Sequence, residues 1–451
     1  MMGLGLEIKE VLDSFARLVS TTVWVNAQIL LVGAILCIGK RTVTSALRVM
    51  GLGQEKEFSK YHKILNRVKL NLLDGSKILL GLLVALVPPK WPLIFLVDDH
   101  IERRKGRKIK KKSCYRDAIR SSKKKVVYCF GLKWVSMMIA VKLPWSRRYW
   151  ALPVITTLAS SKEYDKDHNQ RHKTTVDWAL QMITLIQRWA PDRVIVLVAD
   201  GGYAAVKLAL CCVGLPMPVI LISKLRLDAS LYDPPPPPRK GKRGRNPKKG
   251  NKQRSLLQRI ADPSTSWSII RPLWYDGKRH TLQMFSGVSL WYRSGFDPVE
   301  IKWVVIRDPK GKLRTEAFFS TNITVTAQQI IFWYILRWNI EVTFEELRAH
   351  LGVETQRQWS DPAIAGTTPV LFSLFSLVVL MANKIVKNGE VPIQSYSWYK
   401  KSEATFSDVI AIIRRQIWED RYLKQSSRGP DSSLFTDDLR DILIEIVCWA
   451  S

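Results

Sequence analysis

The sequence predicts a mixed α/β core with a β-rich insertion, flanked by helical N- and C-terminal regions. Residues 93–97 and 194–199 are continuous apolar runs, which are typical of strands buried on both faces of a sheet. Apolar residues at helical spacing over 175–190 lie between these two strands. Alternating apolar residues over 301–306 indicate an antiparallel segment later in the chain. Buried strands separated by helices indicate an α/β domain.

The composition indicates a polyanionic partner. The chain has 451 residues, of which 47% are hydrophobic, so it can form one large domain or two to three smaller ones. Seventy Lys and Arg residues against 39 Asp and Glu residues give a formal net charge of +31, spread over the whole length. Nucleic acid is the commonest partner of such a protein. Charge alone fits equally a protein that only coats phosphates, so motifs must distinguish binding from catalysis.

Residues 1–88 are predicted to be a helical DNA-binding region. Apolar residues recur at helical spacing over 11–19, and a basic stretch covers 39–48. We expect Arg41 and Arg48 in this stretch to contact DNA. The pattern fits a helix-turn-helix or a plain helical bundle.

Residues 89–232 are predicted to form the first part of the α/β core. Besides the two buried strands, we expect strands at 125–131, 134–143 and 218–225, and a helix at 203–212. A strongly basic loop, 103–112, follows the first strand, and we expect Lys105 and Arg107 in it to contact DNA.

Residues 233–322 are predicted to be a basic linker and a β-rich insertion. Five consecutive prolines and a run of Lys and Arg over 234–254 indicate a flexible segment that cannot pack, either a solvated linker or a DNA contact. Short alternating runs over 266–320 predict antiparallel strands, with a hairpin tip at 309–311.

The last part of the core is predicted at 323–390, followed by a C-terminal helical region at 391–451. A capping box at Thr326 and Gln329 predicts the start of a helix, and Gly352 predicts its end. This helix carries Glu341.

Acidic residues follow the two buried strands. Asp98 comes after residues 93–97, and Asp200 comes after 193–199. A carboxylate at the end of a buried strand is costly to desolvate unless it is paired or binds a cation. Each aspartate alone also fits a turn, but the pair suggests adjacent strand ends that share a metal.

One face of the helix that begins at Thr326 carries polar and charged side chains. The four residues are Tyr334, Arg337, Glu341 and Arg348. At about 100° per residue, their side chains fall within about 60° of arc on the helix. An apolar core would favour Leu or Ile on such a face. The alternative is a solvated face on which Arg337 and Glu341 pair at i, i+4.

This spacing resembles the Y-R-E-K signature of cut-and-paste DDE transposases of bacterial insertion sequences, with Arg348 in place of the usual lysine. Residues 97–100 with Lys105-Gly106, and residues 198–200, resemble the regions around the first two acids of that family. The resemblance covers roughly residues 30–385. His100 departs from the family pattern, in which a threonine is common.

The resemblance implies an RNase H-like fold, in which the first and fourth strands lie side by side. It implies that Asp98, Asp200 and Glu341 are the catalytic metal ligands. Asp98 is preferred to Asp99 because its strand end matches that of Asp200 and because it stands two residues before His100. Oxygen ligands suit two Mg²⁺ ions, with Mn²⁺ as a substitute. Tyr334, Arg337 and Arg348 would hold DNA phosphates.

The implied reaction is transposition. Water frees a 3′-hydroxyl at the end of an insertion sequence, and that hydroxyl attacks target DNA in the same site. The implied partners are double-stranded transposon ends and target DNA, bound by a homodimer in the cytoplasm at the bacterial nucleoid. Some relatives form a hairpin held by a tryptophan of the insertion, and Trp303 lies in a suitable strand. The alternatives are a DNA-binding protein that no longer cuts, and an RNase H-like nuclease without strand transfer.

Other kinds of site find little support in the sequence. The six cysteines have no CxxC spacing, so neither zinc fingers nor disulfides are expected, and a reducing compartment fits. His168 and His172 could form half of a zinc site but have no third ligand at a suitable spacing. The apolar runs 29–39 and 369–382 are expected to be core helices rather than membrane spans, and no signal peptide is evident.

Overall fold

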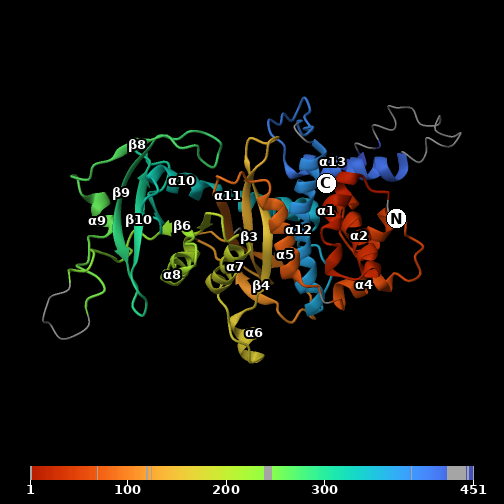
Figure 1. Cartoon of the computed structure of the whole chain (residues 1–451), viewed down its shortest axis with the longest axis horizontal. Coiled ribbons are helices and arrows are strands. Elements are labelled where there is room, and N and C mark those ends of the chain that lie inside the picture. The colour runs from red at the N-terminus through yellow and green to blue at the C-terminus, as the bar shows by residue number, and fades with distance from the viewer. Residues whose placement is uncertain are drawn as a thin grey trace.

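The computed structural model describes residues 3–68, 70–117, 120–122, 124–237, 246–386, 389–423, 443 and 446–449. The molecule is elongated and has three parts (Figure 1). Helices from both ends of the chain gather at one end, the central strands with their covering helices lie in the middle, and the β-rich insertion lies at the other end.

One sheet runs through the central part and the insertion. Among the described residues its strand order is β2-β3-β1-β5-β6-β11-β10-β9-β7, with β4 paired to β3 and β8 paired to β9. The strands are β1 (Leu93–Arg103), β2 (Ser113–Arg116), β3 (Tyr128–Lys142), β4 (Tyr149–Ala159), β5 (Ile195–Ala199), β6 (Ile220–Leu225), β7 (Leu231–Tyr232), β8 (Ser268–Ile270), β9 (Leu282–Trp291), β10 (Val299–Arg307) and β11 (Glu316–Ser320). The predicted insertion therefore extends the core sheet through the β6–β11 pair.

The five core strands have the predicted RNase H-like arrangement. They are β1, β3, β4, β5 and β6. β2, which comes between β1 and β3 along the chain, is a short additional strand. β1, the first of them, pairs in parallel with β5, the fourth. On its other side β1 is antiparallel to β3, which in turn is antiparallel to β4. β6 extends the parallel half of the sheet beyond β5. The predicted fold class is confirmed.

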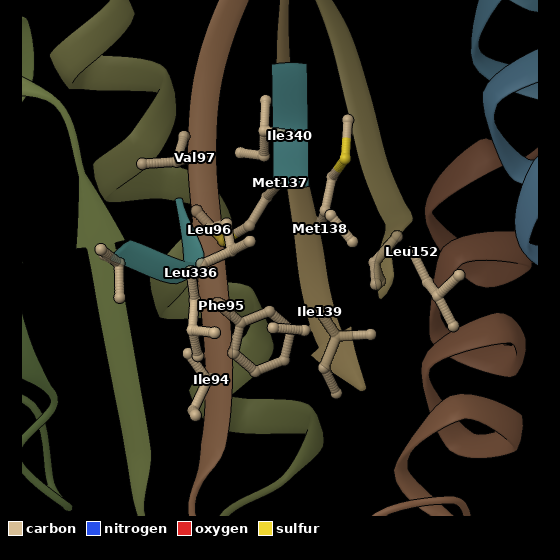
Figure 2. Packing of buried hydrophobic residues seen from close by; sticks show 14 of the residues in the cluster. Ile94, Phe95, Leu96, Val97, Met137, Met138, Ile139, Leu152, Leu336 and Ile340 are labelled. Carbon is tan, nitrogen blue, oxygen red and sulfur yellow. The ribbon is translucent and has the colours of Figure 1, made fainter. Parts of the chain in front are cut away.

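The apolar run at the start of β1 is buried, as the lack of alternation predicts. Phe95, Leu96 and Val97 have no exposed surface. Figure 2 shows these residues packed among Met137 and Ile139 of β3, with Leu336 and Ile340 coming from later helices. Burial of apolar area on this scale is the main favourable term in folding. The strand that carries Asp98 is therefore fixed by packing in the hydrophobic core.

Two strand predictions were too short. β1 does not end at Val97 but continues through Asp98 and Asp99 to Arg103, because it pairs with β3 along that whole length. The two strands predicted at 125–131 and 134–143 are one strand, β3. Pairing with neighbours extended the strands through polar residues that interrupt the local apolar pattern.

Helices cover the sheet and form the helical end. In the first two-thirds of the chain they are α1 (Leu6–Asp13), α2 (Thr21–Leu36), α3 (Val43–Val49), α4 (Ser59–Asn66), α5 (Leu72–Val84), α6 (Lys162–Asp167), α7 (Thr175–Trp189), α8 (Val206–Gly214) and α9 (Leu256–Ala261), with 3₁₀ turns η1 (Ala16–Leu18) and η2 (Gly201–Tyr203). Later come α10 (Ala327–Leu336), α11 (Trp338–Leu351), α12 (Asp361–Val386), α13 (Phe406–Trp418) and the π-helical turn η3 (Glu419–Leu423). Much of the predicted C-terminal region, 424–442, lies outside the described residues.

The apolar helix α12 joins the helical end to the sheet. It packs on β4 and also on α1, α5 and α13. By length and composition it could cross a membrane, but 72% of its most apolar window is buried inside the protein. That burial is what we expected of a core helix at 369–382.

The insertion has the predicted antiparallel strands. The β10–β11 connection turns at Gly311, whose φ of +68° favours glycine, and whose N–H donates to the carbonyl of Asp308 at 3.0 Å. The prediction that 234–254 cannot pack is wrong for its last part. Residues 246–254 run beside β7, where the backbone N–H of Gln253 donates to the carbonyl of Leu231 at 2.9 Å. Residues 238–245, with most of the basic run, lie outside the described residues.

Candidate active site

Two of the predicted acids lie at the same edge of the parallel strand pair. The last registered pair of β1 and β5 is Val97 with Ala199. Asp98 and Asp200 directly follow these two residues, so they lie at the same end of the two adjacent strands. Asp200 leaves the strand and caps η2, with its Oδ1 accepting from the N–H of Gly202 at 2.8 Å. The hydroxyl of Ser223 on β6 donates to the Asp200 carbonyl at 2.7 Å, which holds this turn against the sheet.

The third acid comes from a helix that is interrupted at Arg337. The sequence predicts one helix over 326–351, but the structure has α10 and α11, which meet at this residue. The N–H of Arg337 donates to the carbonyl of Tyr334, and the N–H of Ile340 donates to that of Arg337, so the turn has i to i−3 hydrogen bonds. The tightened turn changes which side chains share a face.

Arg337 joins two of the three acids. Its Nη1 donates to Asp98 Oδ2 at 2.7 Å, and its Nη2 donates to Glu341 Oε1 at 2.8 Å. The side chains of Arg337, Asp98 and Glu341 are 13%, 17% and 40% exposed. One half-buried guanidinium thus brings together acids that are far apart in the sequence.

The electrostatics of Asp98 are those of a buried acid with a like charge nearby. Its pKa is raised to about 7, mainly because the carboxyl is buried and also because Asp200 lies nearby, whereas the charge of Arg337 lowers it. Burial disfavours the charged form of Arg337, but Asp98 and Glu341 outweigh it and raise the pKa of that guanidinium. Asp98 is therefore an acid whose charge depends on a cation.

The neighbouring Asp99 has different partners. The hydroxyl of Tyr203 donates to Asp99 Oδ1 at 3.2 Å, and Lys133 Nζ lies 3.7 Å from Asp99 Oδ2. Successive residues of a strand point to opposite faces of a sheet. Only Asp98 bonds to the arginine that holds Glu341, which supports the preference for Asp98 over Asp99.

The three acids fit a hard divalent cation by donor chemistry. All their side-chain donors are carboxylate oxygens, the ligands that Mg²⁺ and Mn²⁺ prefer. In the part of the chain that the structure describes, no three acids, histidines or cysteines are arranged closely enough to hold a metal ion. Arg337 supplies the positive charge instead, and its own Nε is buried without a hydrogen-bond partner. Asp98, Asp200 and Glu341 could hold cations once Arg337 releases Asp98 and Glu341.

Two of the predicted DNA contacts are engaged inside the protein. Tyr334 is only 2% exposed, and its ring packs on Phe318 with centroids 4.3 Å apart. Arg41 donates to the carbonyls of Ile38, Gly39 and His350. Neither side chain is available to a phosphate in this conformation. The reason is tertiary packing, which a helical wheel does not contain.

The other predicted contacts remain accessible. Arg48, Lys105 and Arg107 are exposed, and Arg348 is partly exposed beside His100 and Glu354. Their contact with DNA remains a prediction.

His100, which departs from the family pattern, is a buried core residue. It is 8% exposed, and its ring lies 4.6 Å from that of Phe344 and 5.1 Å from that of Phe372. Burial lowers its pKa to about 3, so the ring is neutral. The imidazole fills an aromatic slot between β1 and two helices.

The other histidine pair has a local role. His172 Nδ1 lies 2.7 Å from Asp165 Oδ2, and the His168 ring stacks on Tyr164 with centroids 3.9 Å apart. Both histidines therefore make local contacts in and directly after α6.

The aromatic group near the acids differs from the expected one. Trp303 is 1% exposed, and its Nε1 donates to Ser289, so it cannot stack on a base. Trp338, directly after Arg337, is 44% exposed, and its ring lies 5.6 Å from that of Tyr275 in the insertion. The sequence patterns did not indicate this pair. The one local feature that could have pointed to it is the position of Trp338 next to Arg337.

Comparisons with known proteins identify the family of the chain. A family model described as DDE superfamily endonuclease matches residues 14–281, more than half of the chain. A second model, described as archaeal putative transposase ISC1217, matches residues 286–389. The structure is similar to the piggyBac transposase synaptic complex with hairpin DNA, at 8% identity and a TM-score of 0.42, over 98% of this chain and 84% of that chain. No curated protein matches the sequence. On its two family matches, the chain belongs to the DDE superfamily endonucleases and is a DDE-type transposase.

Proposed function

We propose that this transposase binds the ends of an insertion sequence, hydrolyses phosphodiester bonds to free 3′-hydroxyls and joins these to target DNA. The observation that carries the proposal is the meeting of Asp98 and Glu341 at Arg337, with Asp200 on the adjacent strand end. A surface ion pair between Arg337 and Glu341 alone would not account for acids that come from three elements, β1, α11 and the end of β5.

Each residue has a distinct part in the proposed reaction. Asp98, Asp200 and Glu341 would hold two Mg²⁺ ions, which activate the attacking oxygen and stabilise the leaving oxygen. Arg337, released from the acids, would donate hydrogen bonds from both of its Nη atoms to a DNA phosphate. This two-bond geometry suits a guanidinium. Buried β1 and β5 keep the first two carboxylates in place while the helix turn at Arg337 adjusts.

We propose double-stranded DNA as the partner and a homodimer as the working form. Excision needs cuts at both ends of an element, and one set of three acids can process one end at a time. The net charge of +31 supports binding to DNA phosphates along much of the surface. The proposed location is the bacterial cytoplasm, at the nucleoid.

The alternatives are a DNA-binding protein that no longer cuts and a nuclease without strand transfer. Asp98 and Glu341 share Arg337, and Asp200 follows the adjacent strand, which favours a cutting enzyme over the first alternative. A joining assay distinguishes the second.

The proposed function is tested with labelled duplexes that carry the element's terminal inverted repeat, incubated with Mg²⁺ and a supercoiled plasmid. We expect new 3′-hydroxyl ends and labelled plasmid joined to them. Cleavage without joined plasmid would identify a nuclease. Binding without cleavage would identify a DNA-binding protein.

The dimer is tested by mixing two inactive proteins on paired ends. One is Glu341→Gln, which binds but does not cut, and the other carries a DNA-binding defect in the N-terminal region. If each protomer grips one end and cuts the other, the mixture should recover some cleavage. No recovery at any ratio, with a mass of one protein and one end for the active complex, contradicts the dimer.

A further inference from the structure

A groove lies between the N-terminal helices and the segment that joins α11 to α12. Its volume is about 640 Å³, within the range of pockets that hold ligands. Its lining includes Thr42, His62, Asn66, Arg67, Arg357 and Trp359. Arg67, Arg357 and His62 are exposed, and Trp359 is 57% exposed. The groove thus combines cations with a large accessible aromatic face.

The basic loop after β1 reaches the same groove. Lys108 Nζ lies 5.2 Å above the centroid of the Trp359 ring. Lys112 of the same loop lies over Phe130, which is 55% exposed, and Lys111 lies over Tyr164. Three lysines of one loop therefore lie over three aromatic rings. Alternating cations and accessible rings are typical of surfaces that hold single-stranded nucleic acid, where bases stack and phosphates pair with cations.

The segment that carries Trp359 is firmly attached to the core. Gln356 Nε2 donates to Thr368 at 3.2 Å, and Thr368 donates to the buried Glu102 of β1 at 3.0 Å. Arg104 donates to the carbonyl of Gln358. Ser360 donates to Asn66 of α4 at 2.5 Å, which closes the other wall. Trp359 is held in place before any ligand arrives, so little ordering is needed on binding.

The groove is also connected to the acids. β1 continues from Asp98 to Arg103, and the next residue, Arg104, donates to the carbonyl of Gln358 in the groove lining. α11 runs from Glu341 to Leu351, in front of the segment that carries Arg357. These lengths are about 17 Å of strand and about 15 Å of helix. One strand and one helix therefore lead from the acids towards the groove.

We propose that this groove binds an unpaired segment of DNA strand close to the cleavage site, with a base stacked on Trp359 and phosphates held by Arg67 and Arg357. The inference rests on the proposed function, because it assigns a second contact to the same DNA substrate. No residue that lines the groove belongs to the acid cluster.

The test measures binding without metal, so cleavage does not enter. The probes are a fluorescent duplex with a single-stranded oligothymidine extension and the same duplex with blunt ends. Trp359→Ala should weaken binding of the extended duplex about tenfold and leave binding of the blunt duplex within about twofold. Trp359→Phe should restore most of the affinity, because it keeps an aromatic face. Trp91→Ala is the matched control, since Trp91 is 54% exposed and lies before the opposite end of β1.

Charge is tested separately with Arg67→Gln and Arg357→Gln. Each should lower the slope of log affinity against log salt for the extended duplex by about 0.7, the value for one phosphate contact on a single strand.

Three results would overturn the inference. One is equal loss of affinity for blunt and extended duplexes with Trp359→Ala, and another is equal loss with Trp359→Ala and Trp359→Phe. Unchanged binding by Trp359→Ala would overturn it too, and it would leave the proposed function intact if end cleavage in Mg²⁺ continues. Absence of cleavage in the wild-type protein would instead count against the proposed function, whatever the groove does.

Discussion

Arg337 and Asp98 are joined by a hydrogen bond of 2.7 Å between Nη1 and Oδ2, although 239 positions separate them in the chain. The same guanidinium reaches Glu341 at 2.8 Å. In this structure Arg337 therefore lies between the carboxylates of two proposed metal ligands, and its positive charge stabilises them as a metal ion would.

Arg337→Gln should strengthen metal binding while it weakens cleavage. A guanidinium this close repels a divalent ion, so in protein without DNA we expect the affinity for Mn²⁺ to rise about tenfold. Cleavage should fall because the proposed phosphate contact is lost. Isothermal titration with Mn²⁺ measures the first effect. Arg348→Gln, on the same helix, is the control and should leave the affinity for Mn²⁺ unchanged, whereas weaker Mn²⁺ binding by Arg337→Gln would contradict the role of a competing cation.

Glu102→Gln should destabilise the fold. Glu102 is fully buried and accepts from Arg104 at 2.6 Å, from Trp134 at 2.7 Å and from Thr368 at 3.0 Å. Loss of its charge leaves the buried guanidinium of Arg104 unpaired, which costs on the order of 3–5 kcal/mol. Urea unfolding measures the change, and the exposed Glu345→Gln is the control. A change no larger than that of the control would show that the network contributes little.

His350 should make stability depend on pH in the acid range. Burial lowers its pKa to about 4, and the charges of Arg414, Arg41 and Lys401 act in the same direction. In the unfolded chain its pKa is about 6.5. A group with a depressed pKa in the folded state favours unfolding once the unfolded chain takes up the proton, so its contribution is present above pH 6.5 and is lost as pH falls towards 4.

The measurement compares urea unfolding of the wild type and His350→Gln from pH 7.5 to pH 4. We expect the stability difference in favour of the wild type to be largest at neutral pH and to shrink as the solution is acidified. A difference that stays constant across this range would mean that His350 does not titrate differently in the two states.

Neutral residues in place of the basic run should weaken DNA binding and flatten its salt dependence. The substituted residues are Arg239, Lys240, Lys242, Arg243 and Arg245. Each lost phosphate contact lowers the slope of log affinity against log salt by about 0.9 on duplex DNA. Fluorescence anisotropy over a salt series measures the slope, with a melting curve as the control for folding. An unchanged slope would identify the run as a linker.

Much of the fold was predictable because its signals are local. The apolar runs of β1 and β5, the N-cap of α10 at Thr326 and the stop at Gly352 each depend on neighbouring residues. The parallel pairing of the first and fourth core strands came from the family resemblance and is confirmed. The extension of β1 past Asp98 was not predictable, because the strand continues only through its pairing with β3.

The site was predictable in its acids but less so in its surroundings. Spacing alone put Tyr334 on one face with Arg337 and Glu341. The turn at Arg337 and the packing of Phe318 instead bury Tyr334. Arg41 looks like a DNA contact in the sequence, yet its partner is the carbonyl of His350, 309 positions away. Contacts over such separations leave no pattern in a single sequence.

The central claim is that Asp98, Asp200 and Glu341 form one metal-dependent cutting site. The most direct measurement is single-turnover cleavage of end DNA in Mg²⁺ by Asp98→Asn, Asp200→Asn, Glu341→Gln and the matched control Asp99→Asn. We expect the first three to cut about a thousandfold more slowly, with end-DNA affinity within about twofold of the wild type, because a lost ligand removes several kcal/mol of transition-state stabilisation. Asp99→Asn should still cut. Normal Mg²⁺-dependent cleavage by Asp200→Asn, or an inactive Asp99→Asn beside an active Asp98→Asn, would contradict the site described here.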